Sequence, residues 1–146
     1  LYSPGSTYKP LVAIAALTEG IINPRSIVIC TGRYEHYSDY QPVCWIYTNT
    51  GGTHGTETVA EAITDSCNIF FYDVGRRLGI TSIVDYATKF GLGQKTGIEI
   101  GEYQGMVAGP ESAATLGLQW YGGDTLPAAI GQGNLYFEGI LSHKQM

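Results

Sequence analysis

The sequence predicts a mainly helical chain with long loops, on three observations. Residues 11–17 are apolar without interruption, and a helix that is apolar on every side is a buried one. Segments 69–78 and 80–90 repeat their apolar residues with the 3.6-residue period of an amphipathic helix. The chain also contains 20 glycines and 11 tyrosines, a composition that predicts many turns between the helices.

The length, the net charge and the absence of long apolar stretches limit the classes of protein to which the chain can belong. A chain of 146 residues is long enough for one domain with a sizeable core. The formal charge of −5, without a basic run, argues against nucleic acid as a partner. No stretch approaches the roughly 20 apolar residues of a membrane span, and no signal peptide is recognised. Because the chain begins at Leu1 inside an apparent motif, we expect an excerpt of a longer protein, so missing anchors say little about its location.

The first predicted helix carries a candidate catalytic pair at its start. Ser6 and Lys9 are three residues apart, which places both side chains on one helix face. The buried run 11–17 follows, and Gly20 is a suitable stop signal. A serine hydroxyl becomes a good nucleophile only when a base takes its proton, and burial at a helix N-terminus lowers the pKa of a lysine. The plainer alternative is that Ser6 caps the helix and Lys9 is a solvated charge.

The segment from 21 to 57 is predicted to be irregular. A turn at Asn23-Pro24 precedes a short strand at 26–29, and the polar, aromatic stretch 31–55 reads as an excursion with a short hairpin. His54 is interpreted as a structural or surface histidine, and no metal is implied, because no second histidine or carboxylate cluster accompanies it. Cys30 and Cys44 either form a disulfide across this excursion or are unpaired buried thiols, while Cys67 makes the count odd.

Two helices are expected to meet at a polar corner around residue 66. Residues 58–61 match a capping box, with an acid three residues after a hydroxyl, and open a helix to about Asp65. A second helix over 69–78 follows and ends at Gly79. Ser66 and Asn68 fall between these helices, where polar side chains can project into a cleft.

The remaining segments are predicted as one more helix and a long loop. An amphipathic helix spans 80–90, and the glycine-rich loop 91–97 lacks the phosphate-loop pattern and a preceding strand. A short strand is expected at 98–100, and a short helix at 111–120 interrupts the loop 101–127.

Five segments resemble penicillin-binding transpeptidases of the serine β-lactamase superfamily. Ser-x-x-Lys followed by Ser-x-Asn is two thirds of that superfamily's signature. The similar segments are Pro4 to Pro10, Glu61 to Phe71, Phe90 to Glu102, Gly123 to Thr125 and Ala129 to Gly133. The resemblance covers residues 1–133 in one order, which we interpret as a partial transpeptidase domain.

The resemblance implies both a fold and a set of roles. The fold would be α/β (α+β), an antiparallel sheet flanked by helices plus a helical subdomain, with this chain supplying mainly the helical part. Ser6 would attack the carbonyl of a D-alanyl-D-alanine stem peptide or of a β-lactam, and Lys9 would accept its proton. Ser66 would relay a proton to the leaving amine, and Asn68 would bind the substrate amide. No cofactor is implied, and the parent would be membrane-anchored outside this excerpt, on the extracytoplasmic face of the bacterial plasma membrane.

Two segments depart from the family pattern. Lys95-Thr96-Gly97 spells the third active-site motif but stands in a loop without a leading strand, so we do not assign it there. The true third motif would lie beyond the chain, and because it carries an oxyanion-hole donor, we expect the chain alone to be severely impaired. Residues 134–146 form an atypical tail, and Asn134 to Gly139 is close to a protease site used to remove expression tags.

Three other functions stay open. A serine β-lactamase needs a base for the deacylating water, and the Glu-x-x-x-Asn typical of its loop is not found. A β-lactam sensor domain would be acylated once and signal. A catalytically incomplete structural fragment is the third alternative, because the third motif is missing.

Overall fold

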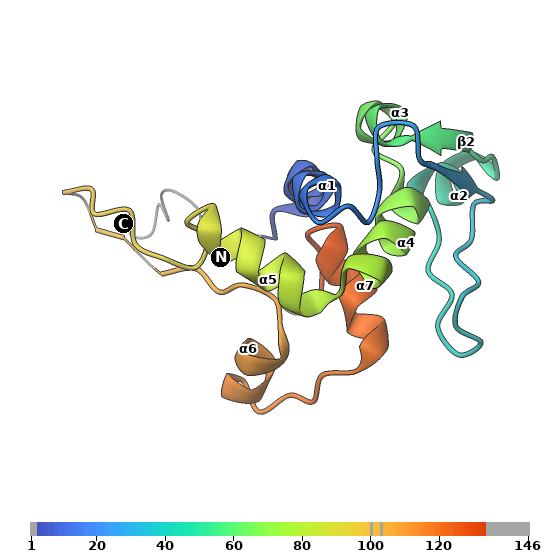
Figure 1. Ribbon diagram of the computed structural model, residues 1–146. Coiled ribbons are helices and arrows are strands. Elements are labelled where there is room, and N and C mark those ends of the chain that lie inside the picture. Colours follow the sequence, from blue (N-terminus) through green and yellow to red (C-terminus); the bar gives the residue numbers. More distant parts are fainter. Residues whose placement is uncertain (1–2, 100, 103, 134–146) are drawn as a thin grey trace.

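Helices far apart in the sequence form the core (Figure 1). The computed structural model describes residues 3–99, 101–102 and 104–133. Four helices pack against one another: α1 (Lys9–Thr18), α4 (Asn68–Leu78), α5 (Ile80–Lys89) and α7 (Thr125–Ala129). The α4–α7 approach is close because residue 75 is glycine, and a Cβ there would collide with that of Ala129. The predicted mainly helical chain is thus confirmed.

Helix α1 follows from the apolar run recognised in the sequence. Pro10 occupies its first turn, where a missing N–H costs nothing. Most of the run is buried, but Ile14 is 44% exposed, so one face of α1 is open in the described residues.

A small antiparallel ribbon lies at one end of this core, beside α3 (Figure 1). Strand β1 (Ile27–Cys30) pairs with β2 (Gly55–Thr58), with Cys30 opposite Gly55. Between them, the excursion holds a single bridge from Arg33 to Val43 and a short helix, α2 (Trp45–Thr50). The predicted strand 26–29 is confirmed with a shift of one residue. Helix α2 and strand β2 were not predicted, since the glycine-rich residues around 51–55 resemble turns and β2 depends on a distant partner.

The helices around the polar corner match their predictions closely. Helix α3 (Val59–Thr64) begins after Thr58, whose backbone N–H donates to Glu61 Oε2 at 2.8 Å, as the capping box predicts. Helices α4 and α5 have the expected bounds within one residue, and Gly79 separates them.

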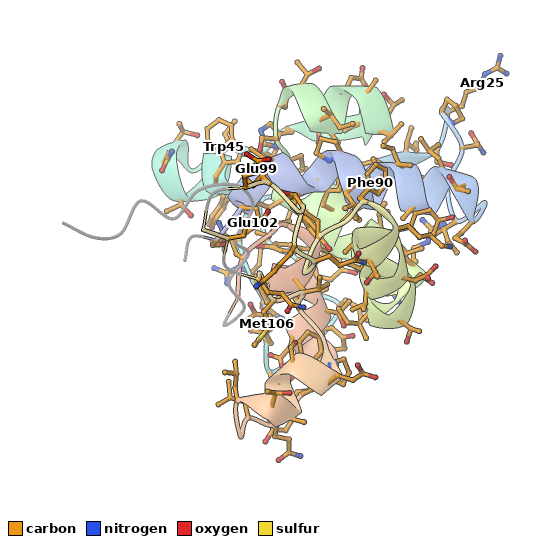
Figure 2. The ribbon with its side chains drawn as sticks, turned by 90° about the vertical axis from the view of Figure 1, so that its left-hand side faces the viewer. Arg25, Trp45, Phe90, Glu99, Glu102 and Met106 are labelled. Carbon is orange, nitrogen blue, oxygen red and sulfur yellow. The ribbon has the colours of Figure 1, made fainter. Side chains whose placement is uncertain are left out.

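The chain after α5 is mostly loop, carrying Phe90, Glu102 and Met106 on one side of the molecule (Figure 2). Helix α6 (Pro110–Thr115) is shorter than the predicted 111–120, and η2 (Gly122–Asp124) leads into α7, which was not predicted. The predicted strand at 98–100 is wrong for Ile98 and Glu99, because the described residues offer them no pairing partner. Residue 100 lies outside the described residues. Residues 134–146, the predicted tail, also lie outside them.

The fold class agrees with the expectation that this chain is the helical part of an α+β domain. The described residues contain one two-stranded sheet and are otherwise helical or loop-like. Among them no helix combines the length and apolar character that crossing a bilayer requires.

Candidate active site

Ser6 lies on a tight turn that leads directly into α1. The turn is the 3₁₀ helix η1 (Gly5–Tyr8), and the Lys9 N–H donates to the carbonyl of Ser6, so the two helices are continuous. The Ser6 side chain is exposed, and within the described residues no hydrogen bond is formed by its hydroxyl. Ser6 therefore does not cap the helix, and the plainer interpretation of Ser6 as a helix cap is wrong.

Gly131 holds the Ser6 turn from the other end of the chain. The Gly5 N–H donates to the Gly131 carbonyl at 2.8 Å, and the Ser3 hydroxyl donates to the same oxygen. A Cβ on Gly131 would collide with the Gly5 carbonyl oxygen and lie 2.8 Å from Tyr8 Cβ. Gly131 also has a φ of +66°, where an L side chain is strained. Position 131 therefore needs glycine.

Lys9 is buried, and its amine contacts the polar corner between α3 and α4. Its side chain is only 1% exposed. The Nζ atom lies 2.6 Å from the Ser66 carbonyl oxygen, 3.0 Å from Ser66 Oγ and 2.7 Å from Asn68 Oδ1. Lys9 is thus buried, and the plainer interpretation of Lys9 as a solvated charge is wrong as well.

The oxygens around Lys9 suit a neutral amine as well as an ammonium. The Ser66 carbonyl and Asn68 Oδ1 can only accept, and together they use the two N–H bonds of an uncharged amine. The Ser66 hydroxyl can accept from an ammonium or donate to the lone pair of an amine. Lys9 can therefore lose a proton without losing a hydrogen-bonding partner.

Burial lowers the pKa of Lys9 to about 8, and the acidic groups Cys44, Cys67 and Glu57 oppose this shift. A fraction of the amine is then neutral near physiological pH. Since the folded-state pKa is below the unfolded one, Lys9 opposes folding most strongly below about pH 8. That penalty declines as the pH rises from about 8 toward 10.5.

The corner that presents Ser66 and Asn68 is held in an uncommon conformation. Ser66 has a φ of +52° and, among the described residues, is the one non-glycine in the left-handed region. Its carbonyl is thereby free to accept from Lys9. The corner is secured by the Asn68 N–H, which donates to Cys44 Sγ at 3.3 Å, and by the Trp45 indole, which donates to the Asp65 carbonyl at 3.0 Å.

The strain at Ser66 leads to a prediction that distinguishes the effect of the backbone conformation on stability from the effect of losing the hydroxyl. Ser66→Ala and Ser66→Gly both remove the hydroxyl, but only glycine adopts a positive φ without penalty. We expect Ser66→Gly to be more stable than Ser66→Ala by about 1 kcal/mol in urea unfolding, and both to be acylated more slowly than the parent. Equal stabilities would show that the left-handed backbone is not retained in solution.

The structure brings three of the four predicted site residues into direct contact: Lys9, Ser66 and Asn68. Ser6 lies one turn before Lys9 at the surface. Lys95, Thr96 and Gly97 lie on an exposed loop, where the Thr96 and Gly97 N–H groups donate to the Glu102 carboxylate at 2.9 Å each, so they do not act here as a strand. Gly131 and Cys44 were not predicted as supporting residues. The Gly-x-Gly pattern at 131–133 was the available signal for Gly131.

A second cluster of reactive groups lies behind the corner and corrects the interpretation of His54. The side-chain donor atoms of Cys30, Cys44, His54 and Cys67 all lie within 4.8 Å of one another. The three cysteines are buried and free, so no disulfide joins Cys30 to Cys44 in this structure. His54 thus does have companions, which are thiols rather than the histidines or carboxylates sought in the sequence. Three cysteines and one histidine are a donor set that can hold a metal ion.

Comparisons with known proteins show which family the chain belongs to. The sequence model of the penicillin binding protein transpeptidase domain matches residues 1–137. The peptidoglycan D,D-transpeptidase MrdA of Salmonella typhimurium is 37% identical over 143 residues, covering 91% of this chain and 21% of that protein. The chain therefore spans about a fifth of the length of this curated relative.

Solved structures show the same fold. PBP2 of Pseudomonas aeruginosa, in complex with WCK 5153, is 35% identical and superposes with a TM-score of 0.81 over 92% of this chain and 30% of that one. Penicillin-binding protein A of M. tuberculosis, solved as an imipenem acyl-enzyme complex, is 25% identical with a TM-score of 0.69, over 92% of this chain and 29% of that one. Sequence and structure together place the chain in the family of penicillin-binding protein transpeptidase domains.

Proposed function

We propose that this chain carries the nucleophile, the base and the second motif of a D,D-transpeptidase that cross-links peptidoglycan. The observation that carries the proposal is the buried Lys9 amine, hydrogen-bonded to Ser66 and Asn68 one turn after an exposed serine. An amine of lowered pKa beside a serine is the arrangement that acyl transfer requires. The resemblance to proteins named peptidoglycan D,D-transpeptidase supplies the substrate class.

The first half-reaction forms an acyl-enzyme at Ser6. Neutral Lys9 takes the hydroxyl proton as Ser6 Oγ bonds to the penultimate D-alanine carbonyl of a stem peptide. The C–N bond to the terminal D-alanine breaks, and the leaving amine receives a proton through Ser66. Asn68 uses its side-chain N–H₂ for the substrate amide, because its Oδ1 accepts from Lys9.

The second half-reaction transfers the acyl group. An amine of a second stem peptide attacks the ester carbonyl, its proton passes to the amine of Lys9, and Ser6 regains its hydroxyl proton. A β-lactam would follow the first half-reaction, but its leaving nitrogen stays attached to the acyl group. We further propose that the parent protein is anchored in the plasma membrane with this domain on the extracytoplasmic face, where stem peptides occur.

The direct test is labelling with a fluorescent penicillin. The protein carrying this chain together with the rest of the transpeptidase domain is expected to form a covalent adduct that Ser6→Ala abolishes and that Ser82→Ala, on helix α5, retains. Slow release of the label over hours supports a transpeptidase, whereas release within seconds would indicate a β-lactamase. If no adduct forms on a folded protein, the proposal is wrong and the structural-fragment alternative stands.

The lowered pKa of Lys9 predicts the pH dependence of acylation. Because only the neutral amine accepts a proton, the second-order acylation rate should rise about tenfold per pH unit at low pH and level off above an apparent pKa of about 8. The rate is measured with a fluorescent penicillin from pH 6 to 10, with the intrinsic hydrolysis of the reagent subtracted. A rate still rising tenfold per unit at pH 10 would show an unshifted lysine.

A further inference from the structure

We propose that a small pocket beside the Ser6 turn, between the excursion and η2, binds a primary ammonium group on the donor stem peptide. The ammonium would end the aliphatic side chain of the residue that precedes the acylated D-alanine. Asp124 would pair with it, and the rings of Tyr40 and Trp120 would line its path. This assignment rests on the proposed transpeptidase function, because it names the part of the donor peptide that the pocket selects.

The pocket is the size of one side chain. Its volume is about 270 Å³, which is below the roughly 300–1,000 Å³ of pockets that enclose a whole small ligand. Its walls come from the excursion, from the segment between α6 and η2, and from the residues around α7. The lining includes Tyr40, Leu118, Trp120, Asp124, Pro127 and Gln132. The pocket therefore suits one branch of a peptide rather than the whole peptide.

The pocket adjoins the turn that presents the nucleophile. Gln132 lines the pocket, and the carbonyl of the preceding residue, Gly131, accepts from the Gly5 N–H at 2.8 Å. The Gln132 N–H donates to the Pro127 carbonyl at 2.8 Å, so the loop that holds the Ser6 turn is also a wall of the pocket. The residue next to the acylated D-alanine lies about 3.8 Å along the peptide, and four methylenes add about 5 Å. A side chain of that length can pass Gly131 and enter the pocket.

Asp124 gives the pocket a negative charge that no nearby cation offsets. Among the described residues that line the pocket, Asp124 is the one acid, and none is a lysine, arginine or histidine. Its Oδ2 atom accepts from the Tyr121 N–H at 2.7 Å, and its side chain does not cap α7. Within the part of the chain that the structure describes, it forms no ion pair. The carboxylate can therefore accept a charge-assisted hydrogen bond from an incoming ammonium.

Two aromatic rings stand beside this carboxylate. The ring of Tyr40 packs on Gly123, where an added Cβ would lie 3.3 Å from Tyr40 Cδ1. Burial and the charge of Asp124 raise the pKa of Tyr40, so its hydroxyl stays neutral near that charge. Trp120 packs against Ala128 at the floor of the pocket. Aromatic faces attract an ammonium, and the apolar lining can cover its methylenes, so the pocket favours an alkyl ammonium over an anion.

The experiment compares two penicillins on the protein that carries this chain with the rest of its domain. Both have an unbranched aliphatic acylamino side chain of the same length, which ends in a primary ammonium in one and in a hydroxyl in the other. The ammonium compound is expected to acylate Ser6 about 3- to 30-fold faster, the effect of a part-exposed ion pair together with a cation–π contact. Second-order rates are measured by mass spectrometry of the adduct.

Each variant is judged by the ratio of the two rates, in which a general loss of folding or reactivity cancels. Asp124→Asn should bring the ratio to about one, because the amide oxygen can still accept from the Tyr121 N–H but the charge is lost. Tyr40→Leu should lower the ratio about 2- to 5-fold through the lost ring, and Tyr40→Phe should restore it. Asp85→Asn, which removes the same charge from an exposed site on α5, should keep the parent ratio.

The outcomes separate this proposal from the one on catalysis. Adducts with both penicillins at a ratio near one would overturn the ammonium pocket and leave the transpeptidase standing, as would a parent ratio kept by Asp124→Asn. Should Asp124→Asn not fold, a parent ratio kept by Tyr40→Leu has the same meaning. No adduct with either compound on folded protein would refute the transpeptidase and this proposal with it. If an added alkyl amine speeds release of the adduct through Asp124, without any preference in acylation, the pocket serves the second peptide and the assignment to the donor is wrong.

Discussion

Replacing Lys9 by Met is expected to lower the rate of acylation at Ser6 by about 10²–10⁴-fold, the usual contribution of a general base. Methionine fills a similar volume in the buried site, so the loss would come from the missing amine rather than from a cavity. The Ser66 carbonyl and Asn68 Oδ1 would lose their donor, which should also cost stability of about 1–3 kcal/mol. The rate is measured with a fluorescent penicillin, and folding with circular dichroism.

Two further variants identify what Lys9 does. Lys9→Arg keeps a positive charge that does not titrate below pH 12, so it should lose a comparable amount of activity if the base is what matters. Lys89→Met, at an exposed lysine paired with Asp85 at 2.6 Å, should keep the parent rate. If Lys9→Arg retained the parent rate, Lys9 would act as a fixed charge and the base assignment would be wrong.

Substitution of Gly131 by Ala is expected to slow acylation by about 10-fold to 10²-fold, although residue 131 carries no reactive group. The added methyl would displace the Gly5 carbonyl and with it the turn that presents Ser6. A shift of about 1 Å in a reacting group can cost about 10²-fold in rate. The strained φ adds a destabilisation of about 1–3 kcal/mol, which urea unfolding would measure.

A matched glycine tests whether strain alone explains this loss. Gly20 has a similar φ of +69°, but a Cβ there meets no atom within 4 Å. Gly20→Ala should therefore lose stability and keep its acylation rate. Equal loss of rate in both variants would show that Gly131 acts through general stability rather than through the Ser6 turn.

The candidate site residues could be recognised in the sequence because each pair forms a local pattern. Ser6 and Lys9 are three residues apart, and Ser66 and Asn68 two, so each pair is placed by one helical turn or one corner. Their meeting is not local, since Lys9 and Ser66 are 57 residues apart. Only the resemblance to a known family connected the two pairs in the sequence. Packing of α4 against α1 makes that connection physically.

The thiol cluster shows where sequence reasoning stopped. Zinc sites are recognised by short, regular spacings, but here the four donors are separated by 13, 9 and 12 residues. The histidine was judged by its sequence neighbours, all glycine or threonine. It acquires its companions only when β2 pairs with β1, and β2 is too short and too rich in polar residues to show as a strand.

The sequence by itself determined the helices α1, α4 and α5 and pointed to Ser6 as the candidate nucleophile, because apolar runs, apolar periodicity and motif spacing are properties of neighbouring residues. Only the tertiary structure decided that Lys9 is buried, that Gly131 holds the Ser6 turn and that three thiols surround His54. These depend on contacts between segments tens of residues apart, which form through the combined packing of the core, so neighbouring residues do not reveal which segments meet.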